Sequence, residues 1–586
     1  MRQYDNIRSE IPENIDKKKA HIIGGGIAGL ANAVFLIDDG YMSGKNITIY
    51  EKLPVVGGSM DAADADHNFG YTCRGERELE PNMECLWYLC SKIESVDSPG
   101  MTILEETVAA NKHDLIDSKT RILWKQGKTY PKTHSFKMSA ALSARLGELI
   151  QTPEEIIEDV TIDEFFGDLK DEWYASTTWI CFHTMLAFKN YHSVIEMKRY
   201  LLRFIQHMPG IDHLQGILHT KYNEYDSIIK PVKKWLEDKG VNIITDFSVY
   251  DLNMDSNNNE VLAIKAHDKD GKDVTIDLDT ANEFVVLTSG SMTTNSTYGD
   301  NTTVAITNRD TADRGVFTIW ENLAKKDAKF GKPEKFISDV DKTKWMSACI
   351  TIKGYPEFYD RIYKMTKNKP DTQTGAISIQ DSNWDISMCF YPKYFADQKD
   401  DENVFWFDTL YGENNGDYIK KPSSECTGEE MVTELLYHLG VLDMKDDLLA
   451  HSYISTCMMP YITSQFMPRK ISDRPSVVPE GCTNLALIGQ YVELPGDVVF
   501  TVETSVRTAM MGAYDLLGLT RPVLPIYEAQ YDTRILVASL KKMLDTDEIK
   551  LSDLPKINPL KIASQSQELL KTINNTPTLD INDAQY

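Results

Sequence analysis

A glycine-rich segment near the start of the chain carries the clearest chemical signal. Gly24, Gly26 and Gly29 have the spacing GxGxxG and lie between a short apolar run and a longer one. In a strand–turn–helix unit, the first glycine permits a tight turn, the second lets a pyrophosphate approach the backbone, and the third lets helix and strand pack closely. The amides and the positive end of the helix then favour phosphate. A plain glycine turn is the alternative, but the flanking runs predict a dinucleotide site.

A carboxylate and a second glycine pair follow where such a site needs them. The alternating run 46–52 predicts a second strand, and Glu51 near its end could bind the hydroxyls of an adenosine ribose. Gly57 and Gly58, followed by Ser59, add backbone donors for a longer nucleotide. This addition favours FAD over NAD, so we predict FAD as the cofactor.

Two later segments complete the predicted flavin site. The strand-like run 284–292 contains small residues near its end, as strands beneath flavin nucleotides do, although an ordinary strand exit has the same appearance. Farther on, Asp497 could hold ribityl hydroxyls and Thr501 could open a helix aimed at the flavin ring, with simple helix capping as the alternative for both. The predicted FAD-binding residues are Gly24, Gly26, Ala28, Gly29, Glu51, Gly58, Ser59, Glu78, Val249, Ser289, Gly290, Asp497 and Thr501.

A cluster of charged residues follows the first flavin elements, within the segment 70–82. Such a run is normally a solvated loop. Here it lies between the second glycine pair and the apolar, aromatic segment 85–90, so a carboxylate in it could act as a general acid or base near the flavin. The charged residues are Arg74, Glu76, Arg77, Glu78 and Glu80.

Two other segments place polar or adaptable side chains among apolar ones. The segment 191–207 has the spacing of a helix and contains Tyr191 and Tyr200; a tyrosine there is usually a core residue whose hydroxyl bonds a neighbour. The segment 457–469 mixes methionines, aromatics and small residues. It could line a channel for a flexible apolar substrate, although core packing is the simpler explanation.

These residues need a scaffold that joins distant parts of the chain. Strand–glycine elements at 20–40, 284–292 and 484–518 are separated by long insertions, which indicates one sheet assembled from distant segments. The predicted fold class is α/β: a discontinuous Rossmann-type FAD-binding domain with an inserted substrate domain and a helical C-terminal region. The predicted domains are the FAD-binding domain at 16–135, 220–300 and 475–520, a helical insertion at 136–219, the substrate domain at 301–474, and a C-terminal helical region and tail at 521–586.

Bulk composition narrows the function. The chain has 586 residues, 42% of them hydrophobic and 26% charged, as expected of a globular protein with several domain-sized units. A formal net charge of -26 repels nucleic-acid phosphates, so no nucleic-acid partner is expected. The nine cysteines include no CxxC pair, no metal site is predicted, and the sequence shows neither a signal peptide nor an apolar run of about 18 residues. These features predict a cytoplasmic protein.

Four long motifs together resemble a known family. RGEREL (74–79), HSVIEMKRY (192–200), TKYNEYDSIIKPVKKWLEDKGVN (220–242) and CMMPYITSQFMPR (457–469) are similar to motifs of the fatty acid double-bond hydratases, the oleate and linoleate hydratases also labelled myosin-cross-reactive antigens. The match runs from Asp16 to about residue 520. The resemblance implies a cytoplasmic FAD protein, commonly a homodimer, that adds water across a cis double bond of an unsaturated free fatty acid.

The resemblance also implies roles for two side chains. Glu78 maps onto the family residue that activates water, and Tyr200 maps onto the residue that protonates the alkene. These residue types suit the chemistry, because an unactivated alkene needs a proton donor at one carbon and an oriented water at the other. A carboxylate also stabilises the developing cation. Glu78 and Tyr200 are therefore the predicted catalytic pair.

The chain departs from the family pattern at two places along the expected substrate path. Glu224 stands where many members have glutamine. Cys389, Tyr391 and Tyr394 stand where many members have threonine, asparagine and histidine. These substitutions concern how the substrate is held, so the carbon that receives the hydroxyl stays open.

Two alternative functions stay open. A FAD-dependent oxidoreductase or a fatty acid isomerase of the same fold would use similar elements, although no second GxGxxG marks an NAD(P) site. A non-catalytic flavoprotein that acts as a binding surface is the third reading.

The segment 533–544 near the C-terminus combines an apolar stripe with Arg534, Lys541 and Lys542. A helix of this kind would suit transient contact with a membrane surface. Docking on the protein body or on a dimer partner is the alternative that we favour.

Overall fold

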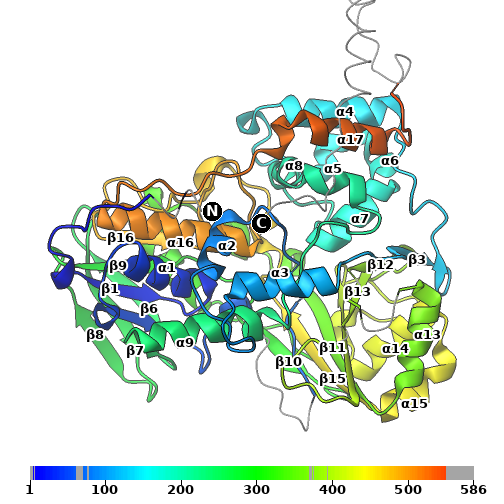
Figure 1. The fold of residues 1–586 in the computed structure, drawn as a ribbon, viewed down its shortest axis with the longest axis horizontal. Coiled ribbons are helices and arrows are strands. Elements are labelled where there is room, and N and C mark those ends of the chain that lie inside the picture. Colours follow the sequence, from blue (N-terminus) through cyan, green and yellow to red (C-terminus); the bar gives the residue numbers. More distant parts are fainter. Residues whose placement is uncertain are drawn as a thin grey trace, which may run out of the picture.

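The computed structural model describes residues 7–60, 70–75, 78–368, 375–391 and 393–549, together with residues 4, 372 and 373. Glu76 and Arg77 of the charged cluster lie outside the described residues, as does the part of the predicted C-terminal region and tail that follows residue 549. The described chain forms two large sheets, with a lobe of helices above the second of them (Figure 1).

A five-stranded parallel sheet is built from distant parts of the sequence. Its strands follow the order β16-β9-β1-β2-β5, and every neighbouring pair is parallel. Ile22, Val286 and Leu487 are fully buried, as expected of a sheet covered on both faces. The strands are β1 Lys19–Ile23, β2 Ile47–Tyr50, β5 Asn242–Ile244, β9 Glu283–Thr288 and β16 Leu485–Ile488. This sheet confirms the predicted discontinuous Rossmann-type fold.

Helices α1 (Ile27–Asp38) and α16 (Val502–Leu517) pack side by side over this sheet (Figure 1). The side-chain amide of Asn32 donates to the backbone oxygen of Ala509 at 2.8 Å and ties the two helices together. Nearly all of α1 is buried, because apolar residues surround most of its circumference. The next helix of this domain, α9 (Lys230–Asp238), ends just before Gly240, as its sequence predicts.

A three-stranded antiparallel sheet extends the nucleotide domain. It comprises β6 (Ser248–Met254), β7 (Val261–His267) and β8 (Asp273–Asp277). Leu252 and Ile264 join it to the hydrophobic core of the parallel sheet. Helix α10 (Val316–Lys326) packs on β6, so this part of the predicted substrate domain belongs structurally with the nucleotide domain.

The second large sheet has eight strands in the order β10-β15-β11-β14-β13-β12-β3-β4. Side chains alternate along β14: Phe405 and Phe407 enter a core shared with helices, while Trp406 enters the core on the opposite face. The strands are β3 Ile122–Trp124, β4 Lys128–Thr129, β10 Thr297–Gly299, β11 Trp345–Lys353, β12 Ile377–Ile379, β13 Ile386–Tyr391, β14 Glu402–Thr409 and β15 Ser452–Met459. The covering helices are α13 Pro356–Thr366, α14 Gly428–Leu439 and α15 Lys445–Ala450.

Three short strands of this sheet come from outside the predicted substrate domain. β3, β4 and β10 come from the segments 16–135 and 220–300, which we assigned to the FAD-binding domain. In the structure β3 pairs with β12, and β10 pairs with β15. These strands are only two or three residues long, and their partners are set by tertiary contacts that a local pattern does not encode.

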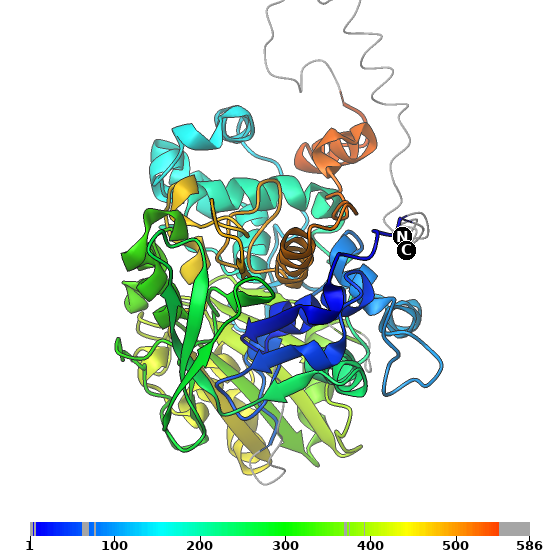
Figure 2. The same cartoon turned by 90° about the vertical axis from the view of Figure 1, so that its left-hand side faces the viewer.

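The helical lobe rises over the second face of this sheet (Figures 1 and 2). Its helices begin at side chains that cap them: Ser139 and Ser176 accept from backbone amides, and Thr161 forms a capping box with Glu164. The lobe comprises α4 Ala140–Gln151, α5 Ile162–Phe166, α6 Lys170–Tyr174, α7 Thr177–Leu186, α8 Val194–Arg203 and the 3₁₀ helix η7 Ile205–Gly210. The C-terminal helix α17 (Thr533–Met543) packs against η7.

The remaining α-helices of the described residues are α2 Glu84–Cys90, α3 Ile103–His113, α11 Glu334–Ile337 and α12 Val340–Thr343. Within the described residues, no helix has both the length and the apolar character that crossing a bilayer requires.

Candidate active site

The first cavity lies at the carboxyl end of the parallel sheet. It has a volume of about 430 Å³ and is lined by residues that follow β1, β2, β9 and β16. Ligands of open parallel sheets bind at this edge. Eight residues of the predicted cofactor site lie in its wall: Gly24, Gly26, Ala28, Glu51, Gly58, Ser59, Val249 and Gly290.

Glu51 holds the glycine turn against the end of β2. Gly24 turns the chain with a φ of +104°, a conformation that glycine adopts readily. The amide of Gly25 then donates to Glu51 Oε2 at 2.7 Å, and the amide of Leu53 donates to Oε1 at 2.8 Å. Two backbone donors therefore fix the carboxylate in the cavity wall, at the position predicted to bind a ribose.

The two remaining glycines of the motif are needed for different reasons. A Cβ atom at Gly29 would lie 2.0 Å from Gly24 O and 3.1 Å from a methyl group of Ile22, so packing between helix and strand requires glycine. A Cβ atom at Gly26 would approach nothing closer than Gly58 Cα at 3.6 Å, which is ordinary contact. The protein itself would accept a side chain at Gly26, so the open space there fits a ligand that approaches the backbone. The cavity and its amides suit a dinucleotide.

The other predicted cofactor residues lie outside the wall that the described residues form around this cavity. Ser289 is fully buried and donates to the backbone oxygen of Ile488 at 3.3 Å. Thr501 caps α16. Asp497 was assigned to ribityl hydroxyls, but it lies between Arg203, at 3.1 Å, and Arg507, at 3.2 Å. The two guanidinium groups neutralise its charge, so Asp497 serves to join α8 to α16.

A second cavity, of about 240 Å³, adjoins the first. Phe500 and Val502 line both cavities, and Arg74 in the first wall is followed by Gly75 in the second. Most of the second wall is made of apolar side chains from α7, α8, η7, the eight-stranded sheet and α17. A mostly apolar cavity with a few polar groups is typical of a site for an apolar small molecule.

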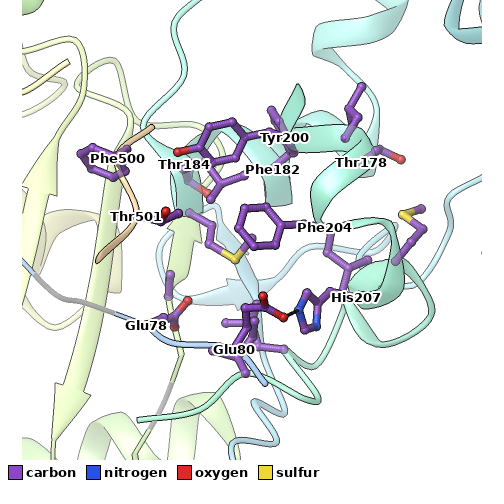
Figure 3. A pocket seen from close by; sticks show the side chains of 18 of the residues that line it. Glu78, Glu80, Thr178, Phe182, Thr184, Tyr200, Phe204, His207, Phe500 and Thr501 are labelled. Carbon is purple, nitrogen blue, oxygen red and sulfur yellow. Dashed lines mark hydrogen bonds and ion pairs between the residues drawn. The ribbon is translucent and has the colours of Figure 1, made fainter. Parts of the chain in front are cut away.

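The predicted catalytic residues Glu78 and Tyr200 line this second cavity together (Figure 3). Glu78 comes from the segment before α2, and Tyr200 comes from α8. Thr501 lies in the same wall, beside Phe500, so it contacts the apolar cavity rather than the nucleotide cavity. Glu78, which we also assigned to the cofactor, lies only in the wall of the apolar cavity.

The environment of Glu78 makes it a stronger base than an ordinary carboxylate. Its Oε1 atom is buried and has no hydrogen-bond partner among the described residues. Burial raises the pKa of the Glu78 carboxyl, while the charge of the buried Arg121 and a backbone bond from Ala376 oppose this shift. An unpartnered carboxylate oxygen beside a cavity can accept a proton from a water molecule that enters it.

The hydroxyl of Tyr200 is held in place and stays protonated. Tyr200 is fully buried, and its Oη donates to the backbone oxygen of Val499. Phe188 and Phe466 pack edge-to-face against its ring at 5.2 Å and 5.7 Å. Burial, with the negative charges of Glu196 and Asp497, raises the pKa of Tyr200 well above its ordinary value. The phenol can therefore act only as a proton donor at ordinary pH.

The structure adds two polar side chains, His207 and Asp408, to the apolar cavity that the sequence did not single out. Glu80, from the predicted charged cluster, accepts from the His207 ring at 3.3 Å. On the sheet side, Asp408 lines the cavity with a buried Oδ2 atom that lacks a hydrogen-bond partner in the described structure. Tyr200 and His207 are seven residues apart, a spacing that would place them on one face of an α-helix and could have identified His207. In the structure α8 ends at Arg203, and His207 lies in the 3₁₀ helix η7. No local signal in the sequence marks Asp408.

The positions where the chain departs from the family pattern lie in different surroundings. Cys389 lines the apolar cavity. Tyr391 and Tyr394 stack on each other with ring centroids 4.0 Å apart, and neither belongs to the cavity wall formed by the described residues. Glu224 is buried and likewise outside that wall. Cys389 is therefore the one of these four substitutions that changes the surface a cavity ligand would touch.

The segment 457–469 packs in the core. Its side chains Met459, Ile462 and Phe466 are buried in the hydrophobic cluster that surrounds Tyr200. None of its residues lies in the wall of either cavity, as these are defined by the described residues. Core packing, rather than a channel lining, therefore explains its composition.

Two known proteins match this chain over most of its length and most of their own. An oleate hydratase from Streptococcus pyogenes serotype M49 (strain NZ131) is 39% identical over 580 residues, which cover 96% of this chain and 97% of that protein. A linoleate hydratase from Lactiplantibacillus plantarum is 30% identical over 575 residues, which cover 90% of this chain and 99% of that protein. Among solved structures, an oxidoreductase from Methanosarcina mazei has a TM-score of 0.49 at 14% identity, covering 84% of this chain and 99% of that one.

The family model described as the MCRA family matches residues 17–514. This range contains both sheets, the helical lobe and every predicted site residue. The family resemblance inferred from the four motifs is thus confirmed, and the chain belongs to the MCRA family.

Proposed function

We propose that this protein is a FAD-containing fatty acid hydratase. It adds water across a cis double bond of an unsaturated free fatty acid of the oleate or linoleate type and yields a hydroxy fatty acid. The observation that carries the proposal is the placement of Glu78 and Tyr200 in one apolar cavity that adjoins the cavity lined by the glycine motif. The names of the two hydratase relatives support the same substrate class.

The two side chains supply the proton transfers that hydration needs. Tyr200 donates the proton of its hydroxyl to one alkene carbon, and Glu78 takes a proton from the water that attacks the other carbon. The apolar wall holds the alkene in a medium of low dielectric, where the Glu78 carboxylate stabilises the developing positive charge strongly. At the end of the step the substrate has gained one hydrogen and one hydroxyl, Glu78 is protonated, and Tyr200 has lost its proton.

The first cavity is the proposed FAD site. Gly24, Gly26 and the N-terminus of α1 would hold the pyrophosphate, and Glu51 would hold the adenosine ribose. When bound, FAD would complete the wall that the cavities share and add its charge distribution to the site, with no net redox change.

The two glycines of the motif give a matched pair of variants. We expect Gly26→Ala to weaken FAD binding while the apoprotein keeps its unfolding temperature, because a Cβ atom there meets only ordinary contacts. We expect Gly29→Ala to destabilise the protein by about 1–3 kcal/mol, because its Cβ atom would collide with Gly24 O. Flavin absorbance and thermal unfolding of both apoproteins test this contrast. Equal loss of stability in the two variants would contradict it.

The rate should depend on pH through Glu78. Burial raises the pKa of this carboxyl above 4.5, so kcat/KM should fall as pH decreases through a value higher than that. The raised pKa of Tyr200 keeps the phenol protonated, so we expect no loss of rate from Tyr200 on the alkaline side up to its ordinary value of 10. A pH–rate profile of the wild type measures kcat/KM on both the acid and the alkaline side.

Glu84 provides the control for this profile. Burial and the neighbouring Glu503 raise the pKa of Glu84 to about 7, yet Glu84 lies outside the cavity wall formed by the described residues. The pH at which kcat/KM falls on the acid side should therefore be the same in Glu84→Gln as in the wild type. If the pH at which kcat/KM falls on the acid side changes in Glu84→Gln, or if it lies at or below 4.5, Glu78 does not set it.

The first experiment is incubation of the flavin-loaded protein with oleate and with linoleate, followed by mass spectrometry of the products. Hydration adds the mass of one water to either acid. A product of unchanged mass with a shifted double bond would indicate an isomerase, and loss of hydrogen would indicate an oxidoreductase. No change in any unsaturated fatty acid would favour a non-catalytic flavoprotein.

We further propose a cytoplasmic homodimer, on the strength of the family resemblance and the buried cysteines. Helix α17 supports docking on the protein rather than on a membrane. Its apolar residues Ile535 and Val537 are buried against the body, Ser539 and Met543 line the apolar cavity, and Leu536 remains exposed. Contact of this exposed edge with a membrane surface stays part of the proposal.

A further inference from the structure

A second acid–base pair lies in the wall of the apolar cavity, beside Glu78. His207 and Glu80 both line this cavity, and their side chains lie next to each other (Figure 3). His207 Nε2 lies 3.3 Å from Glu80 Oε2, and both residues are buried. The other ring nitrogen, Nδ1, is also buried and has no hydrogen-bond partner in the part of the chain that the structure describes.

This arrangement fixes the proton distribution on the imidazole. Glu80 is ionised: although burial opposes it, the bond from His207 and the charge of Arg203 hold the pKa of the Glu80 carboxyl below its ordinary value. An ionised carboxylate can only accept, so the neutral ring carries its proton on Nε2 and leaves a lone pair on Nδ1. A histidine oriented in this way by a carboxylate is suited to accept a proton at its second nitrogen and to give it up again.

His207 lines the same cavity as both proposed catalytic residues. Its charge acts on Glu78, whose pKa is lowered when the His207 ring is protonated. The ring of Phe204 contacts both Tyr200 and His207, with ring centroids 5.5 Å from Tyr200 and 6.1 Å from His207. All three side chains line the same cavity.

The proposed hydration leaves both catalytic residues in the wrong protonation state for the next turnover. After each turnover Glu78 holds the proton taken from water, and Tyr200 lacks the proton given to the alkene. The enzyme is ready for the next substrate only when one proton has moved from Glu78 to Tyr200. Tyr200 is fully buried, so its hydroxyl can regain the proton only from within the cavity.

We propose that His207, oriented by Glu80, returns this proton. The O–H bond of Glu78 breaks and an N–H bond forms at Nδ1; the Nδ1–H bond then breaks and the O–H bond of Tyr200 is restored. Both transfers run through water molecules in the cavity that all three residues line, because the Phe204 ring contacts both His207 and Tyr200. Glu80 keeps its negative charge throughout and stabilises the transient imidazolium. His207 acts through Glu78 and Tyr200, so it is a proton-transfer residue rather than one that touches the alkene. The inference rests on the proposed hydratase function.

Within the described residues, few charged groups lie near His207. Glu80 and Glu78 face it from the segment before α2, and Arg203 approaches Glu80 at 3.4 Å from α8. The charges of Arg121 and His219 also act on Glu78. Helix α17, which packs against η7, contributes Lys542, whose charge is paired with Asp212 at 2.8 Å. In this set Glu80 is the group bonded to the ring.

The test is chemical rescue of His207→Ala in the flavin-loaded protein. We expect kcat to fall about 100-fold, at the lower end of what positioned proton transfer contributes, while KM for oleate is unchanged. Imidazole added to the buffer should restore much of the lost rate, in proportion to its neutral form. Glu80→Gln should also lower kcat, because the amide no longer stabilises an imidazolium.

Gln206→Ala is the matched control. The Gln206 side chain donates to the same Glu80 oxygen at 3.3 Å, but it carries no titratable group and lies outside the cavity wall formed by the described residues. Its kcat should stay near wild type and should not respond to imidazole. Should His207→Ala fail to fold, His207→Gln, which keeps a donor toward Glu80, should show the same loss without rescue.

Three results would overturn the relay: wild-type kcat in His207→Ala, a loss confined to KM, or a loss of kcat that imidazole does not restore in a folded variant. A wild-type protein that hydrates no unsaturated fatty acid would instead remove the proposed function itself. The two failures are therefore distinguishable in one set of assays.

Discussion

Replacing Glu78 with glutamine is expected to lower kcat for oleate hydration by about 10²- to 10⁴-fold, the range that a positioned general base contributes. Glutamine has nearly the shape of glutamate but cannot take a proton from water. Burial raises the pKa of the Glu78 carboxyl and its Oε1 atom lacks a partner among the described residues, so the base strength and the open acceptor are lost together. Steady-state kinetics on the flavin-loaded variant measure the effect.

Retention of flavin separates this effect from a failure to assemble the site. Glu78 lies in the wall of the apolar cavity and outside the wall of the nucleotide cavity, as the described residues form them. Glu78→Gln should therefore stay yellow, with the flavin absorbance of the wild type. Turnover close to wild type in the yellow variant would remove the role assigned to Glu78.

Tyr200→Phe is expected to cause a loss of kcat of similar size, about 10²- to 10⁴-fold, because it removes the proton donor and keeps the aromatic ring. Phenylalanine preserves the edge-to-face packing with Phe188 and Phe466. It loses only the bond from the hydroxyl to Val499 O, a change of about 0.5–1.5 kcal/mol in the free energy of unfolding. The measurement is kcat together with thermal unfolding.

Tyr191 on the same segment offers a matched control. Its hydroxyl also donates to a backbone oxygen, that of Lys342 at 2.9 Å, but it lies outside the apolar cavity wall formed by the described residues. Tyr191→Phe should keep the wild-type rate. If both phenylalanine variants lose activity equally, the loss reflects a damaged helical segment and not a missing proton donor.

The sequence predicts best those parts of the fold whose geometry depends on residues close together in the chain. The strand, glycine turn and helix around Gly24 lie within about twenty consecutive residues, and their backbone geometry is set by residues close in sequence. Glu51 could be placed in the cavity wall for the same reason, since it ends the strand that must pair with β1. The distribution of strand–glycine elements along the chain then sufficed to predict one sheet built from distant segments.

The parts that local patterns do not determine depend on tertiary partners. Asp497 has the residue type of a ribityl ligand, but two arginines from α8 and α16 surround it in the folded protein. The short strands β3 and β10 pair with strands that lie far away in the sequence, so no local pattern assigns them to the second sheet. His207 gains its proposed role only from Glu80, which is 127 positions away.

The central claim, that this fold adds water without net redox change, is tested most directly by the origin of the product oxygen. The flavin-loaded protein is incubated with oleate in water enriched in heavy oxygen, under air, while dissolved oxygen is monitored. The hydratase account predicts that each product molecule gains one water, carries the heavy oxygen in its new hydroxyl, and forms without consumption of dissolved oxygen. A hydroxyl with ordinary oxygen, formed as dissolved oxygen is consumed, would contradict the account.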